Sequence, residues 1–261
     1  KVFGVFGRIV VGNYHNKADA FFTTHSLSVY DNKNYSDLVK SSDIYKSNTF
    51  LPISNKKPLK LTSVCYPINQ KFSAAFNIKS TKIENTKFRQ HPKKLKIASS
   101  NKSKVFKISL TKNESKLIYT KNNLPGRIYV SHNYSLKNSK HPTDIGTAFH
   151  NIHTPAKTNH WGQGVCKKNF NVTFFVRNLS HLKESTPKAK CQIDIFNNNK
   201  KTTKNFSIEG ESYKTKLIKK LNVNLKSNYF SWKIKSNQKN LDVIWVCHNS
   251  STGEICGDHS F

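Results

Sequence analysis

The sequence predicts a mainly β protein with a minor helix, an α+β chain built on antiparallel sheets. Most hydrophobic segments are short, rich in aromatic and β-branched residues, and bounded by Asn, Lys, Ser or Gly, which is typical of strands. In the C-terminal part, hydrophobic and polar residues alternate as they do in half-buried strands. The 17 Phe and 10 Tyr residues argue against a disordered basic chain.

The N-terminal part contains a series of expected strands and one expected helix. The strands cover residues 2–11, 21–30, 61–68, 72–78, 105–110, 117–120 and 127–132. The helix is expected over residues 36–46, with Ser36 as its N-cap, Asp37 in its first turn, and Leu38, Val39 and Ile44 on one side.

The C-terminal part is predicted to be a β-sandwich-like unit that contains disulfides. Its strands are expected at residues 170–176, 191–195, 206–208, 230–234 and 243–247. Residues 217–225 fit either a helix or a strand. A loop-like stretch at residues 154–164 suggests two domains, 1–160 and 161–261, although a single domain remains compatible with the pattern.

The charge of the chain is its most informative property for function. There are 44 basic residues against 14 acidic ones, a formal net charge of +30, and only Arg8, Arg89, Arg127 and Arg177 are arginine. AT-rich coding explains Lys in place of Arg, but it does not explain Lys in place of Glu. We therefore expect an anionic partner, namely RNA or another polyanion such as an acidic glycan.

The sequence also indicates where the protein acts. No apolar run approaches the roughly 18 residues of a membrane span, so no transmembrane segment is expected. The chain contains no Met and starts at Lys1 without a signal sequence, which fits a secreted product whose signal has been removed. A trimmed chain has the same appearance.

The five cysteines suggest a disulfide framework in the C-terminal part. Four candidates for two disulfides, with three possible pairings, lie close together in sequence: Cys166, Cys191, Cys247 and Cys256. The remaining Cys65 is then available for a link to another chain or remains a thiol.

Candidate catalytic residues are His259, His160, Arg127 and Arg8. A pair of acid–base side chains with a cation suffices for metal-free RNA cleavage, since the cation stabilises charge on the phosphorane. The two arginines lie beside glycines and suit phosphate binding, but ordinary strand positions explain them as well. His150, His153 and His160 with Cys166 match no common zinc spacing, so we expect no metal and no cofactor.

Candidate RNA-binding residues combine one aromatic side chain with a lysine cluster. Trp161 follows His160 and is a candidate for base stacking, whereas a core position is the more ordinary role for a tryptophan. The lysines are Lys214, Lys216, Lys219 and Lys220. Lysines at strand edges also guard against aggregation, which explains many of them without a ligand.

In overall character the chain resembles the RNA-cleaving subunits of killer toxins encoded on yeast linear plasmids. The features that carry the resemblance are the basic balance, the start without Met, a cysteine for linkage (Cys65 or Cys256) and the ending Cys256-Gly-Asp-His259. The resemblance implies a disulfide-linked carrier subunit and a late catalytic histidine. It also implies an N-terminal glutamate, but Ile9 lies in that region and the first acidic residue is Asp19.

Two functions of different classes follow from these observations. The first is a secreted toxin that acts in the cytoplasm of a target cell as a metal-independent endoribonuclease on tRNA or rRNA, through histidine acid–base chemistry. The second is a non-catalytic extracellular β-sandwich that binds polyanions or glycans. Clustering of His, Arg and an acid in one cleft favours the enzyme, and scattered histidines favour the binding protein.

Overall fold

The computed structural model describes the strands of the protein and some residues that flank them. The described residues are 10–15, 20–25, 46–50, 59–66, 74–83, 93–97, 104–110, 115–120, 129–136, 143–148, 158–165, 170–179, 186–210, 217–225, 229–239, 241–249 and 255–259.

Regular structure within these ranges is entirely β, and every strand pair but one is antiparallel. The strands, in chain order, are β1 (Val10–His15), β2 (Ala20–His25), β3 (Lys46–Phe50), β4 (Leu59–Tyr66), β5 (Ala74–Ile83), β6 (Lys93–Ile97), β7 (Lys104–Leu110), β8 (Ser115–Thr120), β9 (Tyr129–Leu136), β10 (Thr143–Ala148), β11 (Asn159–Val165), β12 (Phe170–Asn178), β13 (Ala189–Asn197), β14 (Lys200–Ile208), β15 (Leu217–Asn224), β16 (Tyr229–Ser236), β17 (Leu241–Asn249) and β18 (Ile255–His259). The expectation of a β protein with antiparallel sheets is therefore confirmed.

Three sequence-based expectations have different outcomes. The helix expected over residues 36–46 lies outside the described residues except for Lys46, which begins β3. The ambiguous segment after Leu217 is a strand. The stretch expected to be a loop includes β11, so the predicted domain boundary between residues 160 and 161 falls inside a strand.

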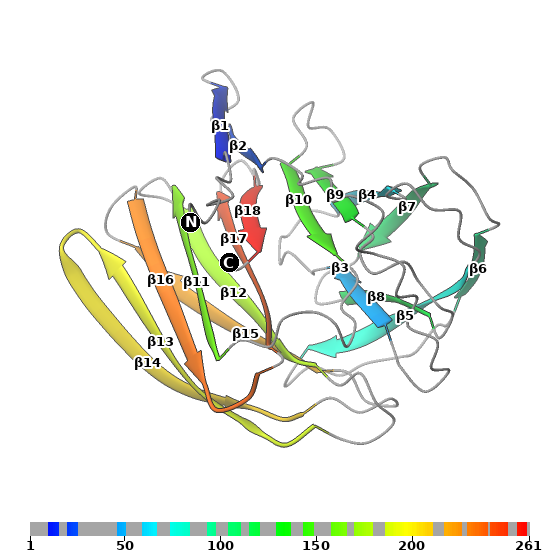
Figure 1. Ribbon diagram of the computed structural model, residues 1–261. Coiled ribbons are helices and arrows are strands. Elements are labelled where there is room, and N and C mark those ends of the chain that lie inside the picture. The colour runs from blue at the N-terminus through cyan, green and yellow to red at the C-terminus, as the bar shows by residue number, and fades with distance from the viewer. Residues whose placement is uncertain are drawn as a thin grey trace, which may run out of the picture.

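The C-terminal strands form a sandwich of two four-stranded layers (Figure 1). Sheet I has the order β11-β16-β13-β14, and sheet II is our name for the β18-β17-β12-β15 part of an eight-stranded sheet that continues through β5. Between them lies a core of buried side chains from both sheets, among them Phe174, Ile193, Trp232 and Trp245. Phe174 meets Trp232 edge to face and Phe230 meets Trp245 in the same way, each pair with ring centroids 5.2 Å apart.

Local sequence explains two details of the sandwich. The β13–β14 hairpin turns through Asn198 and Asn199, whose φ angles of 52° and 57° match the left-handed turn conformation that Asn tolerates. On β11, a Cβ atom at Gly164 would lie 2.6 Å from the Trp245 ring. A residue without a side chain is therefore needed where edge strand β11 crosses this tryptophan.

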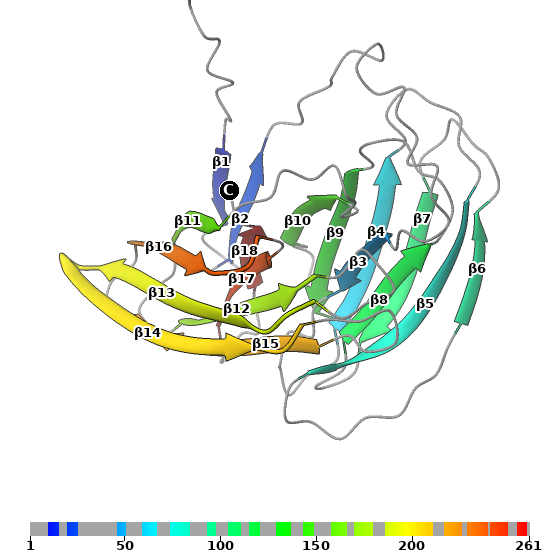
Figure 2. The same cartoon turned by 60° about the horizontal axis from the view of Figure 1, so that its bottom comes forward.

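The N-terminal strands form a second layered region beside the sandwich (Figure 2). One sheet has the order β10-β9-β4-β7, and β5 carries β6 and the series β8-β3. The two regions join where β5 pairs in parallel with β15, through Leu217 opposite Lys82 and Ile218 opposite Ile83. In addition, β10 lies against β18 and β2.

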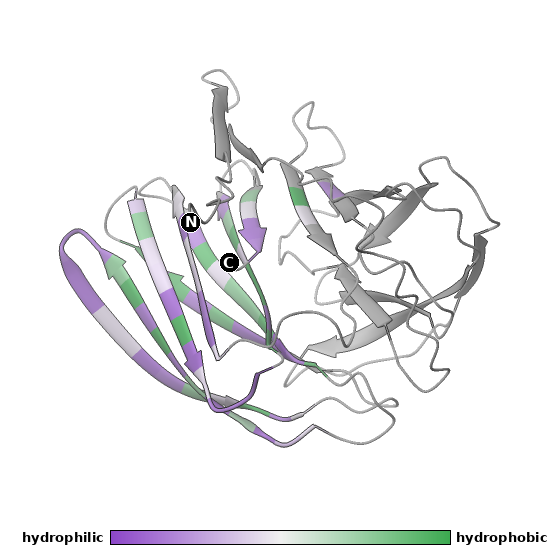
Figure 3. Ribbon diagram, viewed as in Figure 1, coloured by the Kyte–Doolittle hydropathy of each residue, from purple (hydrophilic) through white to green (hydrophobic). Residues whose placement is uncertain are grey.

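The outer face of sheet II is buried, although it points away from the sandwich core. Phe175, Ile244 and Val246 alternate with core residues on β12 and β17, yet each is at most 3% exposed. Ile145 of β10 is also buried, and its Cδ1 atom lies 3.2 Å from the position of a Cβ built on Gly257 of β18. Hydrophobic residues recur along β12 and β17 in Figure 3, as expected for strands covered on both sides.

Candidate functional site

Several candidate residues lie outside the described part of the chain. These are Arg8, Arg127, Lys214, Lys216 and Cys166. The remaining candidates are distributed over both sheets of the sandwich, apart from Cys65, which lies in β4 between β7 and β9.

His160 faces the interior of the sandwich. It lies opposite Ile234, a core residue of β16, and opposed residues of an antiparallel pair point to the same face. Its exposed fraction is only 4%. This position favours a structural role for His160 over the proton-transfer role considered from the sequence, because a substrate has no access to it.

His259 lies elsewhere, on edge strand β18. It is opposite Ile244, whose side chain points away from the sandwich core. His259 is therefore on the outer side of sheet II, whereas His160 of sheet I faces the space between the two sheets. The His259 Nδ1 atom lies 2.9 Å from the Asp258 Oδ1 atom, and the His259 backbone N–H donates to the same oxygen at 2.8 Å. This contact places a carboxylate oxygen beside the imidazole ring, which is partly exposed.

Trp161 is exposed, as a base-stacking role requires, and does not lie in the core. It shares the outer face of sheet I with the two other large hydrophobic side chains that are exposed in the described part of the chain. The exposed fractions are 54% for Trp161, 42% for Phe196 and 70% for Tyr229. Neither Phe196 nor Tyr229 was predicted to bind a ligand from the sequence.

We call this surface the lysine–aromatic face. It consists of the outward-facing side chains of sheet I, which are Trp161 and Gln163 of β11, Tyr229, Ser231, Lys233 and Lys235 of β16, Lys190, Gln192, Asp194 and Phe196 of β13, and Lys201, Thr203 and Asn205 of β14. The strand register arranges them in rows, one of which runs from Trp161 through Lys233 and Asp194 to Thr203. Rings and cations are therefore interleaved on one surface.

The net charge of sheet I is strongly positive. Its four strands carry six lysines and a single acidic residue, Asp194. Lys200, Lys201 and Lys204 belong to β14, an edge strand, where lysines protect against pairing with another chain. Edge protection does not explain Lys233 and Lys235, because β16 is an interior strand of the sheet.

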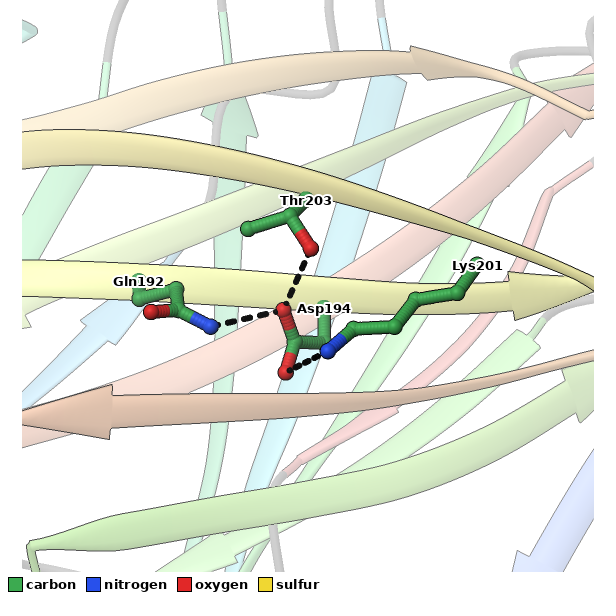
Figure 4. A network of polar contacts seen from close by, with 4 residues as sticks. All are labelled: Gln192, Asp194, Lys201 and Thr203. Carbon is green, nitrogen blue, oxygen red and sulfur yellow. Dashed lines mark hydrogen bonds and ion pairs between the residues drawn. The ribbon is translucent and has the colours of Figure 1, made fainter.

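Asp194 organises the middle of the lysine–aromatic face (Figure 4). Its Oδ1 atom accepts hydrogen bonds from Gln192 Nε2 at 2.9 Å and Thr203 Oγ1 at 2.8 Å, and its Oδ2 atom lies 3.1 Å from Lys201 Nζ. The hydrogen bonds from Gln192 and Thr203, together with Lys201, lower the pKa of Asp194 to about 2. The same Lys201 ammonium lies 6.0 Å from the centroid of the Phe196 ring.

An open hollow adjoins this network at one end of the face. Its polar lining includes Lys190, Gln192, Asn205 and Lys235. Asn237 closes one side, where its Oδ1 atom accepts a hydrogen bond from the Lys190 backbone N–H at 2.7 Å. Cations and amides therefore surround a space that is accessible from solvent.

The predicted lysines of β15 belong to a different surface. Lys219 and Lys220 lie in sheet II, opposite Val176 and Phe175 of β12, and are half-buried. Burial lowers the pKa of Lys220. Burial and the charge of Lys220 also lower the pKa of His248. These lysines and Trp161 therefore do not form one binding surface.

A buried polar cluster of a histidine, an arginine and an acid was not predicted. Arg177 of β12 lies opposite Asp242 of β17, with Nη1 and Oδ2 3.5 Å apart. His132 of β9 is close enough for the charge of Asp242 to affect it, but burial dominates and lowers its pKa to about 3. All three are at most 9% exposed. The scarcity of arginine in this chain is the signal that could have directed attention to Arg177.

The two-disulfide prediction needs correction. Cys191 and Cys256 are buried thiols, and burial raises the pKa of Cys256 to about 12. Burial also raises the pKa of Cys191, although a hydrogen bond with Ser236 acts in the opposite direction and lowers it. Cys247 lies opposite Cys256 and is disulfide-bonded, to a partner outside the described side chains.

Two kinds of feature are absent from the described residues. They contain no group of three or more His, Cys, Asp or Glu side chains that could hold a metal ion. They also contain no helix of the length and hydrophobicity that a membrane crossing needs.

Comparisons with known proteins identify no relative. No protein family matches the chain, and neither a curated protein nor a solved structure shows significant similarity to it.

Proposed function

We propose that this protein binds an extended polyanion and that the lysine–aromatic face is its binding surface. The observation that carries the proposal is the position of Lys233 and Lys235, two lysines on an interior strand beside exposed rings. Edge protection does not account for them, and phosphate or sulfate groups on a flexible polymer are their natural counter-charges.

The arrangement of the titratable groups supports binding over catalysis. His160 and His132 are buried, and His259 lies on a different sheet from the lysine–aromatic face. The cluster of His132, Arg177 and Asp242 has the composition of an acid–base site, but its burial withholds it from a polymer substrate.

Salt dependence of binding tests the proposal. The variant Lys233→Gln/Lys235→Gln removes two charges from the face, and Lys219→Gln/Lys220→Gln removes two from sheet II as a matched control. Each lost phosphate contact reduces the slope of log K against log salt by about 0.7 to 0.9, so the first variant should lower the slope by about 1.5. An equal effect of both variants, in proteins with native circular dichroism, would contradict a localised surface.

A metal-independent endoribonuclease is our second candidate function, favoured by the contact of His259 with Asp258. A carboxylate that holds one ring nitrogen can prepare the other for proton transfer to or from a ribose or phosphate group. In this proposal the protein is a secreted toxin, carried into the target cell by a subunit linked through Cys65.

The test is incubation with total RNA in EDTA, followed by a denaturing gel. Fragments that end in cyclic phosphate and disappear with His259→Ala would support the enzyme. Unchanged cleavage by a folded His259→Ala protein would exclude His259, and intact RNA would exclude the activity.

A further inference from the structure

We propose that the polyanion is a single strand of nucleic acid, whose bases stack on Trp161, Phe196 and Tyr229 while its phosphates contact the lysines beside them. This inference rests on the proposed polyanion binding and adds the class of ligand.

The three rings are positioned for a ligand and not for the core. Each belongs to a strand whose neighbouring residues point into the sandwich, so each ring points away from it. A protein surface seldom gathers its exposed aromatic side chains on one sheet face without a partner. Within the described part of the chain, all large exposed hydrophobic side chains are on this face.

Spacing of the rings fits successive units of an extended polymer. Ser231 lies opposite Phe196, and Tyr229 is two residues before Ser231 on the neighbouring strand. Strand geometry then places the Cα atoms of Phe196 and Tyr229 about 8 Å apart, and those of Phe196 and Trp161 about 12 Å apart. A flat sheet with rings at such intervals can hold several unstacked bases at once.

One lysine lies among the rings and a second lies at their margin. Lys233 is directly opposite Trp161 on one side and Asp194 on the other. Lys235 is opposite Gln192 and lines the hollow. A strand whose bases contact the rings therefore passes its phosphates over these ammonium groups.

Asp194 is the one anion that a phosphate would meet on this face, and its surroundings remove that obstacle. Its carboxylate is largely covered, bound by two hydrogen bonds and neutralised by Lys201. Lys201 also lies over the Phe196 ring. Asp194 therefore acts as a positioning residue for the Lys201 ammonium group and, through it, for the Phe196 ring.

Chemistry of the face distinguishes a nucleic acid single strand from the other polyanions. A sulfated glycan carries charge but no planar base to stack on three rings. A duplex carries phosphates, but its bases are stacked inside the helix and do not reach a flat sheet. Only a single strand offers a charge and an exposed planar group in every repeat unit.

The experiment measures binding of three probes to the full chain by fluorescence anisotropy: a labelled 12-residue oligouridylate, the matching deoxythymidylate, and a heparin fragment. Trp161→Ala and Tyr229→Ala should each weaken oligouridylate binding about 5- to 150-fold, which corresponds to stacking of one base. Trp161→Phe keeps a ring and should restore most of the affinity. Heparin binding should be unchanged by all three variants.

Intrinsic fluorescence supplies an independent readout. The chain has three tryptophans, of which Trp232 and Trp245 are buried and Trp161 is exposed. Base stacking on Trp161 should quench the emission of the protein, and Trp161→Phe should abolish this quenching while binding persists.

The outcomes separate this inference from the proposed function. If oligonucleotides and heparin bind equally and the ring variants weaken neither, polyanion binding stands and the stacking inference is wrong. If no probe binds, the proposed function itself is wrong. Binding of one oligonucleotide in strong preference to the other, with the same dependence on the rings, supports the inference and identifies RNA or DNA as the ligand.

Discussion

The outer faces of the two sheets in the sandwich differ in almost every respect. On sheet II, Phe175, Ile244 and Val246 of the outer face are buried, and β10 and β2 of the N-terminal region lie against its strand β18. On sheet I, the outer face is open and carries lysines and exposed rings. One outer face of the sandwich is therefore buried against the rest of the chain, and the other is open to solvent.

The strand sequences already contain this difference. In β16, buried core residues alternate with residues that are exposed or partly exposed from Tyr229 to Ile234. In β12 and β17, apolar side chains occur on both faces, as in Phe174-Phe175 and Val243-Ile244. Continuous apolar runs indicate strands covered on both sides, and alternation indicates strands with one solvated side.

Loss of the buried ion pair should have the largest effect, because it lies on the covered face. Arg177→Met leaves the Asp242 carboxylate buried without its cation, and we expect the free energy of unfolding to fall by about 3 to 5 kcal/mol. Urea unfolding measures the change. The double variant Arg177→Met/Asp242→Leu removes both charges and should recover most of the loss. Failure of the double variant to recover stability would mean that other contacts of Arg177 matter more.

Truncation of an apolar contact on the covered face should be nearly as damaging. Ile145 of β10 is 1% exposed and lies next to Gly257 of β18. Ile145→Ala should lower the free energy of unfolding by about 2 to 5 kcal/mol through lost burial and a cavity. A loss below about 0.5 kcal/mol, the level typical of surface positions, would argue that β10 does not seal sheet II.

Acid should lower the free energy of unfolding through protonation of His132. Its pKa is about 3 in the folded protein against an ordinary 6.5, so between these values only the unfolded chain binds the proton. Stability is therefore complete above pH 6.5 and should fall toward pH 3, by about 1.4 kcal/mol per pH unit. His132→Gln should reduce this slope.

The pH range of the comparison matters for the interpretation. Asp194 also loses stabilising contacts in acid, but only as the pH falls from its ordinary 3.8 toward about 2. The slope measured between pH 4.5 and 6.5 therefore contains little contribution from Asp194. Burial also lowers the pKa of His248, but His248 contributes equally to the acid sensitivity of the unmodified protein and of His132→Gln. An unchanged slope in His132→Gln would assign the acid sensitivity to other groups.

The smallest effects are expected on the lysine–aromatic face. Phe196→Ser and Tyr229→Ser remove exposed rings, so the free energy of unfolding should change by no more than about 0.5 kcal/mol. Thermal melting measures this directly. A large destabilisation would mean that the rings serve the fold, which would weaken their assignment to a ligand.

Alternation and residue type predicted much of the sandwich, because these features depend on local burial. The strands around Phe174, Ile193, Trp232 and Trp245 were expected close to their observed positions. The strand β11 was missed, since two glycines in its sequence suggested a loop. Those glycines accommodate Trp232 and Trp245 from other strands, a constraint that local sequence does not contain.

The candidate site was only partly predictable for the same reason. Trp161 was a candidate because it follows His160 beside two glycines, but its exposure was not predicted, since a core position is the more ordinary role of a tryptophan. Its association with Phe196 and Tyr229 depends on the order of strands in sheet I, and the separation of Lys219 and Lys220 from it depends on their membership of sheet II. Sheet order arises from long-range pairing, which alternation alone does not specify.

The lysine charges of edge strand β14 relate ligand binding to the solubility of the protein. Its backbone groups along one side have no neighbouring strand in sheet I, and Lys200, Lys201 and Lys204 keep other molecules at a distance by repulsion. A polyanion that neutralises these charges also removes the repulsion. Turbidity should therefore be greatest near charge balance and should decrease again when either the protein or the polyanion is in excess.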